Sequence, residues 1–510
     1  MTPPKVSVVV PVYNPGHDID DCVRTLLDQS LPASDYEVIF VDDGSTDATP
    51  ARLDALARAH PHVRVEHIPN SGWPGRPRNV GIGLARGEFV YFVDNDDWIG
   101  REALERLHAM ATRDGADIVI GKVVGHGKAV PRNLFLRNRT GVDLEWDALL
   151  WLLTPHKLWR RSFLEAHGLR FPEGRRRLED HVMVMRAYFL SPRVSVLADY
   201  PCYHWVLRDR DVNASWGQLD PGSYFANMRE VLDVVDEHTE PGPFRDRLYA
   251  RWYRGKMLNR VEKVHSNPDL GHRMALYRAM HELAAERFPE SVDEWLPLNL
   301  RERSRLLRAG DYEALAALAG FESGLRARAR AVSVLPTAGA LELAIEAELD
   351  GLRFERAGER VFWGPRRADA GAAVRDSSTV QLLLKRRATQ EEYRVPGEAE
   401  PRLVDGPDGV RAVIALSARI DAHTAAGGGA LAPGAWEVYG LVIVAGFRAL
   451  ARVRRRQDAG QLVLEVGPDG RVAERRPGLR RNVRRRVPRP VVRAIRRAQR
   501  AVRRLPRPSG

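Results

Sequence analysis

Short runs of β-branched residues alternate with helical segments over the first hundred residues of the chain. The runs, among them VSVVV and EVIFV, lie at residues 6–10, 37–41, 63–67 and 88–93. Between them, apolar residues recur at helical intervals in segments 19–30, 49–59 and 78–85, as one face of a helix requires. Strands and helices that alternate in this order form parallel sheets. The pattern therefore predicts an α/β domain at the start of the chain.

Acidic clusters follow two of the predicted strands. "VDDGSTD" places Asp42 and Asp43 after the second run, and "FVDNDDW" places Asp94 and Asp96 after the fourth. The carboxyl ends of parallel strands meet at the ligand-binding edge of an open sheet. An Asp-x-Asp there suits a hard divalent cation that neutralises a diphosphate, whereas the first cluster suits hydrogen bonds to a base or a ribose. A solvated turn is the alternative, since aspartate is common in turns.

Five motifs occur in the order and approximate spacing found in family 2 glycosyltransferases. They are VSVVVPVYN, VDDGSTD, NSGWPGRPRNVG, FVDNDDW and LEDHVMVMRAYF, which together span about 220 residues. The chain resembles this family of inverting enzymes with an α/β GT-A (nucleotide-diphospho-sugar transferase) fold. "RPRNVG" and "EDHVMVMRAYF" resemble more particularly bacterial enzymes that add N-acetylglucosamine to poly(ribitol-phosphate) wall teichoic acid. The resemblance implies transfer from a UDP-hexose such as UDP-GlcNAc to a hydroxyl of a cell-envelope polymer, with Mn²⁺ or Mg²⁺ as cofactor.

The resemblance also implies which residues bind the donor. Pro11 and Tyr13 match the strand end that contacts the nucleotide base. Asp42 or Asp43 matches the carboxylate that binds the base or the ribose. The other positions that match donor-binding residues of the family are Asn70, Arg76, Arg78, Asn79, Asp94, Asn213 and Ser215. Guanidinium groups suit phosphate because their forked donors are permanently charged.

Asp180 matches the catalytic base of the family, with Glu179 directly before it, and Asp94 and Asp96 match the metal-binding Asp-x-Asp. Asp96 is the expected direct ligand. Inversion by direct displacement needs a base on the acceptor side of the sugar and an electrophilic group that holds the leaving diphosphate on the other side. It needs no second, nucleophilic carboxylate close to Asp180. A carboxylate that stabilises a helix N-terminus is the alternative for Asp180.

The alternation of strands and helices stops near residue 220. Residues 223–320 carry helical patterns with few turn signals. From about residue 335, short apolar runs are separated by turns rich in Gly, Pro and Asp, as in a β-sandwich, and "HTAAGGGALAPG" predicts a flexible loop among them. The predicted parts are a GT-A glycosyltransferase domain at 1–220, a helical linker region at 221–330, a β-sandwich-like domain at 331–474 and an Arg-rich amphipathic tail at 475–510.

The positive charge of the chain is concentrated in the tail. The net charge is +12, and residues 475–510 hold 15 Arg and no Lys, Asp or Glu, so the preceding residues sum to 12 − 15 = −3. Apolar residues at helical spacing between these arginines favour a helix that lies on an anionic membrane surface. A nucleic-acid arm is disfavoured because no aromatic residue lies among the arginines to stack on bases, and a disordered charged segment is the third possibility. An anionic polyol-phosphate acceptor would also suit this tail.

Other features point to a cytoplasmic protein at the inner face of the membrane. The first residues lead directly into a strand instead of a signal peptide, and the two cysteines, Cys22 and Cys202, form no disulfide or zinc motif. His156, His181 and His204 lack the spacing of a metal site and predict structural roles. A homo-oligomer is expected from the family resemblance alone.

Two other functions compete with the transferase. A nucleotidyltransferase would need a glycine-rich phosphate loop with a nearby lysine after the first strand, and "PVYNPGHD" has neither. A catalytically inactive wall-polymer-binding module is the second alternative. The presence of Asp94, Asp96 and Asp180 argues against it.

Overall fold

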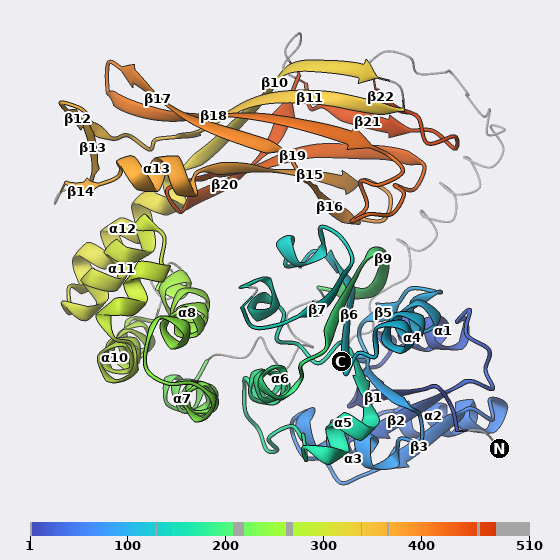
Figure 1. The fold of residues 1–510 in the computed structure, drawn as a ribbon. Coiled ribbons are helices and arrows are strands. Elements are labelled where there is room, and N and C mark those ends of the chain that lie inside the picture. The colour runs from blue at the N-terminus through green and yellow to red at the C-terminus, as the bar shows by residue number, and fades with distance from the viewer. Residues whose placement is uncertain are drawn as a thin grey trace, which may run out of the picture.

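The protein has three parts, which Figure 1 shows as an α/β domain, a group of helices beside it and a strand-rich domain that lies across both. The computed structural model describes residues 3–128, 130–145, 147–207, 219–261, 269–337, 339–364, 367–455 and 460–475. The predicted fold class is confirmed for these parts, whereas tail residues 476–510 lie outside the described residues. Within the described ranges, no helix has both the length and the apolar character that a bilayer crossing demands.

The first sheet has a parallel half and a mixed half. β1 pairs in parallel with β2 and β4, and β2 pairs in parallel with β3. The order of the sheet is β3-β2-β1-β4-β8-β6-β9-β5, with β7 paired to β9. Its strands are β1 (Val6–Val12), β2 (Tyr36–Asp42), β3 (Val63–His67), β4 (Phe89–Phe92), β5 (Trp98–Ile99), β6 (Ile118–His126), β7 (Arg139–Val142), β8 (Leu158–Arg160) and β9 (Val194–Val206). Strands form where the valine-rich runs predict them, because parallel strands are covered on both faces.

Helices cover this sheet on its two sides. They are α1 (Asp20–Leu27), α2 (Thr49–Ala59), α3 (Gly75–Leu84), α4 (Ala103–Asp114), α5 (Arg161–Ala166) and α6 (Glu179–Leu190), with short turns η1 (Asn133–Phe135) and η2 (Asp147–Trp151). A Cβ at Gly81 would lie 2.2 Å from Val9 Cγ1. The glycine in "GIGLARG" therefore lets α3 pack closely on β1, and close packing fixes the position of the α3 residues that face the site.

The helical region begins at α7 and ends at α12. Its helices are α7 (Pro221–His238), α8 (Pro243–Trp252), α10 (Leu270–Arg287), α11 (Leu298–Arg308) and α12 (Tyr312–Gly324), with the shorter turns η5 (Leu258–Arg260) and η6 (Glu290–Trp295). Between α8 and η5 the chain makes a π-helical turn, η4 (Tyr253–Met257). Such turns hold one extra residue and are frequent at functional sites. Trp252 Nε1 donates a hydrogen bond to His181 Nδ1 over 3.0 Å, which ties this region to α6.

The strand-rich domain has the alternating burial of a two-layered β structure, as on β18, where every second residue is buried. Its main sheet runs β16-β15-β19-β20-β10-β11-β18-β17. The strands are β10 (Arg326–Thr337), β11 (Ala340–Asp350), β15 (Thr379–Arg386), β16 (Glu392–Val395), β17 (Glu398–Gly406), β18 (Gly409–Asp421), β19 (Gly434–Val444), β20 (Phe447–Arg454), β21 (Val463–Val466) and β22 (Val472–Glu474), with a small sheet of β12 (Glu355–Ala357), β13 (Arg360–Trp363) and β14 (Ala368–Asp369) and the helix α13 (Gly371–Ser377). The predicted boundary at 331 falls inside β10.

The β domain packs directly on the α/β domain through the loop at 423–434. Ala426 is 1% exposed, and a Cβ at Gly427 would lie 2.4 Å from the carbonyl oxygen of Ala198. The segment is a loop, as predicted, and part of it is buried because these glycines allow a close approach to β9 that larger residues would block. Beside this loop, Lys122 of β6 is buried with its Nζ 4.0 Å from the centre of the Tyr393 ring. Burial lowers the pKa of Lys122 to about 7.

Candidate functional site

A cavity of about 380 Å³ lies at the carboxyl ends of β1, β2 and β4. The predicted residues that line it are Pro11, Tyr13, Asp43, Asn70, Arg78, Asp94 and Asp96. Tyr13 is 50% exposed, so its ring is open to a ligand. The prediction that both acidic clusters lie at one ligand-binding edge agrees with this geometry, because parallel strands bring their carboxyl ends together.

The two carboxylates of the first cluster have different surroundings. Asp42 is 2% exposed, and its Oδ2 lies 2.8 Å from Nδ1 of His67, away from the cavity lining. Asp43 faces the cavity and accepts hydrogen bonds from the backbone N–H and the hydroxyl of Ser71, both at 2.9 Å. Burial raises the pKa of Asp43. The sequence left the choice between these residues open, and the geometry favours Asp43 as the donor contact.

Arg78 joins the second acidic cluster to the start of α6. This arginine is buried, with Nη2 donating to Asp94 Oδ1 over 2.8 Å and Nη1 donating to Glu179 Oε1 over 3.3 Å. His156 Nε2 lies 2.9 Å from the other oxygen of Asp94. Although burial opposes it, His156 and Arg78 hold the pKa of Asp94 well below its usual range. Both carboxylate oxygens of Asp94 therefore have partners in the protein.

Glu179 and Asp180 form the first turn of α6. Leu178, directly before them, has a φ of 65°, a left-handed conformation that is rare for leucine. Backbone strain of this kind costs about 1–3 kcal/mol and clusters at functional sites. Burial and the charge of Asp180 raise the pKa of Glu179 to about 7.

Burial also raises the pKa of Asp180, and nearby Lys256 and Arg78 oppose that rise. Lys256 comes from the π-helical turn η4, so the helical region contributes to the surroundings of the predicted base. Asp180 Oδ1 accepts a hydrogen bond of 2.9 Å from the backbone N–H of His181. A carboxylate whose pKa is raised toward neutrality is suited to proton transfer.

Asp94, Asp97 and His156 form a cluster that could hold a metal ion, since one ligand atom from each lies within 4.8 Å of the others. Asp97 is 1% exposed and accepts hydrogen bonds from the hydroxyl of Tyr203 at 2.6 Å and the N–H of Val206 at 2.8 Å. Burial and the charges of its acidic neighbours raise the pKa of Asp97. The sequence predicts only a structural role for His156, because nothing in its spacing links it to a motif 62 residues earlier.

Other predicted residues lie outside the cavity lining. Asn79 exchanges hydrogen bonds with the backbone of Phe171 at 2.8 and 2.9 Å, which anchors α3 to a neighbouring segment. Arg76 is not part of the cavity lining, but its charge lowers the pKa of Asp43. Asn213 and Ser215 lie outside the described residues. His204 stacks on Trp98 with ring centres 3.4 Å apart, in keeping with the predicted structural role.

Two family models match the chain. The model described as "Glycosyl transferase family 2" matches residues 7–170, and the one described as "Glycosyl transferase TarS linker domain" matches residues 221–319. The second match coincides with the helical region. Together they cover the turn that carries Lys256 and every residue of the cavity lining except Arg175.

Curated relatives share the same part of the chain. Poly(ribitol-phosphate) beta-glucosyltransferase of Bacillus spizizenii is 37% identical over 233 residues, which are 45% of this chain and 37% of the relative. Poly(ribitol-phosphate) beta-N-acetylglucosaminyltransferase TarS of Staphylococcus aureus is 30% identical over 61% of this chain and 54% of the relative. Glycosyltransferase GlyG of Streptococcus pneumoniae is 31% identical over 38% of this chain and 68% of the relative. The chain thus spans about half or less of the length of the first two relatives.

Solved structures extend the likeness. The crystal structure of S. aureus TarS 1–349 in complex with UDP-GlcNAc has a TM-score of 0.56 and 27% identity, over 71% of this chain and 99% of that one. A longer TarS structure has a TM-score of 0.55 over 93% of this chain and 86% of that one; its 21% identity shows the likeness of fold alone. The α/β domain therefore has the GT-A fold, and the chain belongs to glycosyl transferase family 2.

Proposed function

We propose that this protein is an inverting glycosyltransferase that moves a sugar from a UDP-linked donor to a hydroxyl of a polyol-phosphate polymer of the cell envelope. The observation that carries the proposal is the bridge made by Arg78 between Asp94 of the donor cavity and Glu179, the neighbour of Asp180. A transferase must hold the diphosphate and the base on opposite sides of the anomeric carbon of the same sugar. The same guanidinium lowers the pKa of both Asp94 and Asp180, which supports a single site.

The donor would occupy the cavity at the carboxyl ends of β1, β2 and β4. Tyr13, Asp43 and Asn70 line this cavity. Tyr13 would stack on the base, and Asp43 and Asn70 would bind the base or the ribose. The donor in the related TarS structure is UDP-GlcNAc, and a relative named as a glucosyltransferase supports UDP-glucose equally. We therefore propose that the donor is either UDP-GlcNAc or UDP-glucose.

Mn²⁺ or Mg²⁺ fits the carboxylates at the end of β4. Their oxygen atoms are the ligands that hard divalent cations prefer. Asp96 lines the cavity and would be the direct ligand, with Asp94 and Asp97 beside it. When bound, the ion supplies positive charge to the leaving diphosphate.

Asp180 would accept the proton of the acceptor hydroxyl. Its pKa is raised by burial, and a base with a pKa near the working pH is the most effective. Arg78 would keep Asp94 and Glu179 in place and add a fixed positive charge between the diphosphate and the base. Direct displacement then needs no nucleophile from the protein.

The acceptor side of the site is cationic. Arg251, Arg260 and Arg177 all lie close enough to Lys256 to lower its pKa, while Asp180 opposes them and burial is the largest cause. Such a group of cations favours an anionic acceptor, and the relatives are named for poly(ribitol-phosphate). Membrane attachment through the tail at 476–510, a cytoplasmic location at the inner membrane face and a homo-oligomer are further proposals, which a vesicle-flotation assay and light scattering would check.

A panel of UDP-sugars tests the function directly. Purified protein, Mn²⁺ or Mg²⁺, one UDP-sugar and purified poly(ribitol-phosphate) are combined, and UDP release and sugar incorporation are both measured. We expect one UDP-hexose to give equal amounts of both products. No release from any donor, together with retention of the polymer by the protein, would favour the inactive polymer-binding module instead.

A further inference from the structure

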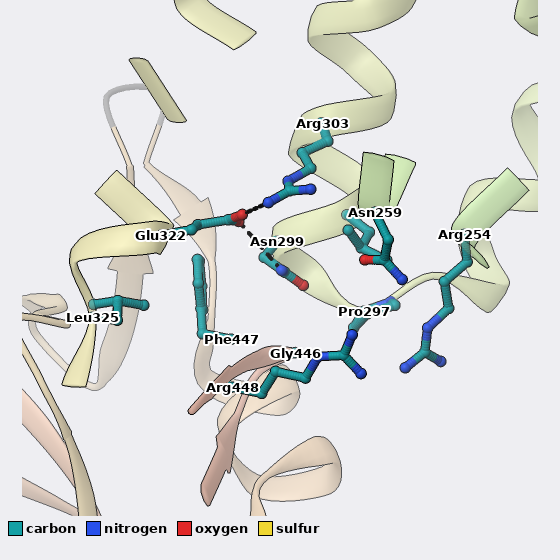
Figure 2. Close-up of a pocket in the computed structure, with 11 residues that line it drawn as sticks. Arg254, Asn259, Pro297, Asn299, Arg303, Glu322, Leu325, Gly446, Phe447 and Arg448 are labelled. Carbon is teal, nitrogen blue, oxygen red and sulfur yellow. Dashed lines mark hydrogen bonds and ion pairs between the residues drawn. The ribbon is translucent and has the colours of Figure 1, made fainter. Parts of the chain in front are cut away.

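A second cavity lies between the helical region and the β domain, apart from the donor cavity. Its volume is about 130 Å³, whereas a single water needs roughly 10–15 Å³ of such space. The lining comes from η4, η5, α11 and α12 on one side and from the turn into β20 on the other (Figure 2). The pocket therefore has room for a small solute, and it forms only where the two domains meet.

Positive charge dominates the lining of this pocket. Three of its residues are the arginines Arg254, Arg303 and Arg448, and the only carboxylate among the described lining residues is Glu322. Arg303 forms an ion pair with Glu322, which also accepts a hydrogen bond of 3.2 Å from Asn299 Nδ2. Glu322 is thus engaged on the side of the pocket away from Arg254 and Arg448 (Figure 2). Among the described lining residues, arginines therefore outnumber carboxylates three to one.

Arg448 lines the pocket and is exposed to solvent. Partial desolvation and the positive charge of Arg132 lower the pKa of its guanidinium. No carboxylate within the described part of the chain forms an ion pair with Arg448. Arg254 is held across the pocket with its guanidinium 5.0 Å from the centre of the Trp151 ring. Two guanidinium groups that converge on a cavity are the arrangement that binds phosphate oxygens through forked, charge-assisted hydrogen bonds.

Asn299 adds a second requirement on the ligand. Its side chain is 93% buried, and its Oδ1 has no hydrogen-bond donor among the described residues. Figure 2 shows this oxygen directed into the pocket, toward the side where Asn259 lies. Gly446, with a φ of 97°, packs closely against this oxygen, since a Cβ there would lie 2.3 Å from it. A buried acceptor without a donor is destabilising, so a ligand hydroxyl would stabilise the pocket.

We propose that this pocket binds a phosphate group that carries a neighbouring hydroxyl, as in a polyol phosphate. Arg254 and Arg448 bind the phosphate oxygens, and Asn299 accepts the hydroxyl. The same chemistry has two sources, a small free polyol phosphate or one unit of a polymer whose other units lie toward Asp180. The turn η4 favours the polymer, because it carries Arg254 into this pocket and Lys256 toward Asp180.

Binding is tested without any transfer reaction, on the full chain. sn-Glycerol 3-phosphate, inorganic phosphate and glycerol are titrated separately, and the dissociation constant and the rise in melting temperature are measured for each. We expect glycerol phosphate to bind more tightly than inorganic phosphate, and glycerol not to bind. Arg448→Gln should weaken glycerol phosphate binding about tenfold or more, because it removes charge-assisted hydrogen bonds. Arg452→Gln, on the same strand but outside the pocket, is the matched control and should bind as the wild type does.

Two results would overturn the proposal: no saturable binding of glycerol phosphate to the wild type, or equal binding by the Arg448 and Arg452 variants. A transfer assay with ribitol-phosphate oligomers of increasing length then distinguishes a polymer unit from a small free phosphate as the ligand. Only this assay depends on the proposed function. A higher KM of Arg448→Gln for long oligomers only indicates a polymer unit. An unchanged KM at every length, with binding lost, indicates a small free phosphate. Because the binding assay uses no donor, its failure is distinct from failure of the transferase proposal.

Discussion

Arg78 Nη1 lies 3.3 Å from Glu179 Oε1, although 101 positions separate the two residues in the chain. This contact closes the donor side of the site against the first turn of α6. Both side chains are buried, so neither charge is well solvated. The integrity of the site therefore depends on a salt bridge whose partners cannot be replaced by water.

Replacing Arg78 with Gln should destabilise the protein and abolish donor binding. The change leaves Glu179 and Asp94 without their cation, and breaking a buried pair costs about 3–5 kcal/mol. Urea denaturation measures the free energy of unfolding, and calorimetry with UDP measures binding. Arg76→Gln, two residues earlier and outside the ion pairs, should change stability by less than about 0.5 kcal/mol. Equal losses in both variants would contradict the bridging role of Arg78.

Asp180→Asn and Asp96→Ala should separate catalysis from donor binding. Without its base, the Asp180 variant should lose transfer by about 10²–10⁴-fold and keep its affinity for the UDP-sugar. The Asp96 variant should lose both, because the ion that binds the diphosphate loses a ligand. Transfer rates and UDP-sugar binding are measured with and without Mn²⁺. Near-normal turnover by Asp180→Asn would exclude Asp180 as the base.

Lys256→Met should move the acidic limb of the pH–rate profile to higher pH. Asp180 acts as a base only when ionised, and burial raises its pKa while Lys256 lowers it. Without the cation, the pKa of Asp180 should rise further. The profile of kcat/KM between pH 5 and 8 reports this shift. Lys256→Arg should restore the wild-type profile, and Lys385→Met in the β domain should not alter it; a shift in the opposite direction would contradict this electrostatic role.

Lys122 should make the stability of the protein depend on pH. Burial lowers its pKa from 10.5 to about 7, so between these values the unfolded chain binds a proton that the folded chain does not. The stabilisation is complete above pH 10.5 and is lost as pH falls toward 7. Relative to Lys122→Met, the wild type should gain roughly 1.4 kcal/mol of unfolding free energy per pH unit from pH 7 to 9. Parallel curves for the two proteins would refute this assignment.

The sequence predicts the α/β domain well because its local signals and its topology agree. Valine-rich runs that alternate with amphipathic segments have few solutions other than a covered parallel sheet. That topology then places Asp43 near Asp94, since both follow strands of the same sheet. The carboxylates of the site could therefore be predicted from their positions at strand ends.

Residues that reach the site from distant segments could not be predicted in this way. His156 precedes β8, which pairs antiparallel with β4, and no periodicity in the sequence reveals that pairing. Lys256 depends on a π-helical turn, for which the sequence "YRGKM" carries no distinct pattern. Asn79, predicted to contact the donor, hydrogen bonds to the backbone of Phe171. The sequence does not reveal in which direction this side chain points.

The loop at 423–434 contacts β9 at Ala198, and the same strand carries Tyr203, whose hydroxyl donates to Asp97. The β domain thus packs against β9, the strand whose Tyr203 hydrogen bonds to the acidic motif beside the donor cavity. Separation of the two domains would also expose Lys122, whose Nζ lies against the Tyr393 ring, so we expect the two halves to melt together. Scanning calorimetry of the whole chain should accordingly give one cooperative endotherm, with a calorimetric enthalpy equal to the van't Hoff value.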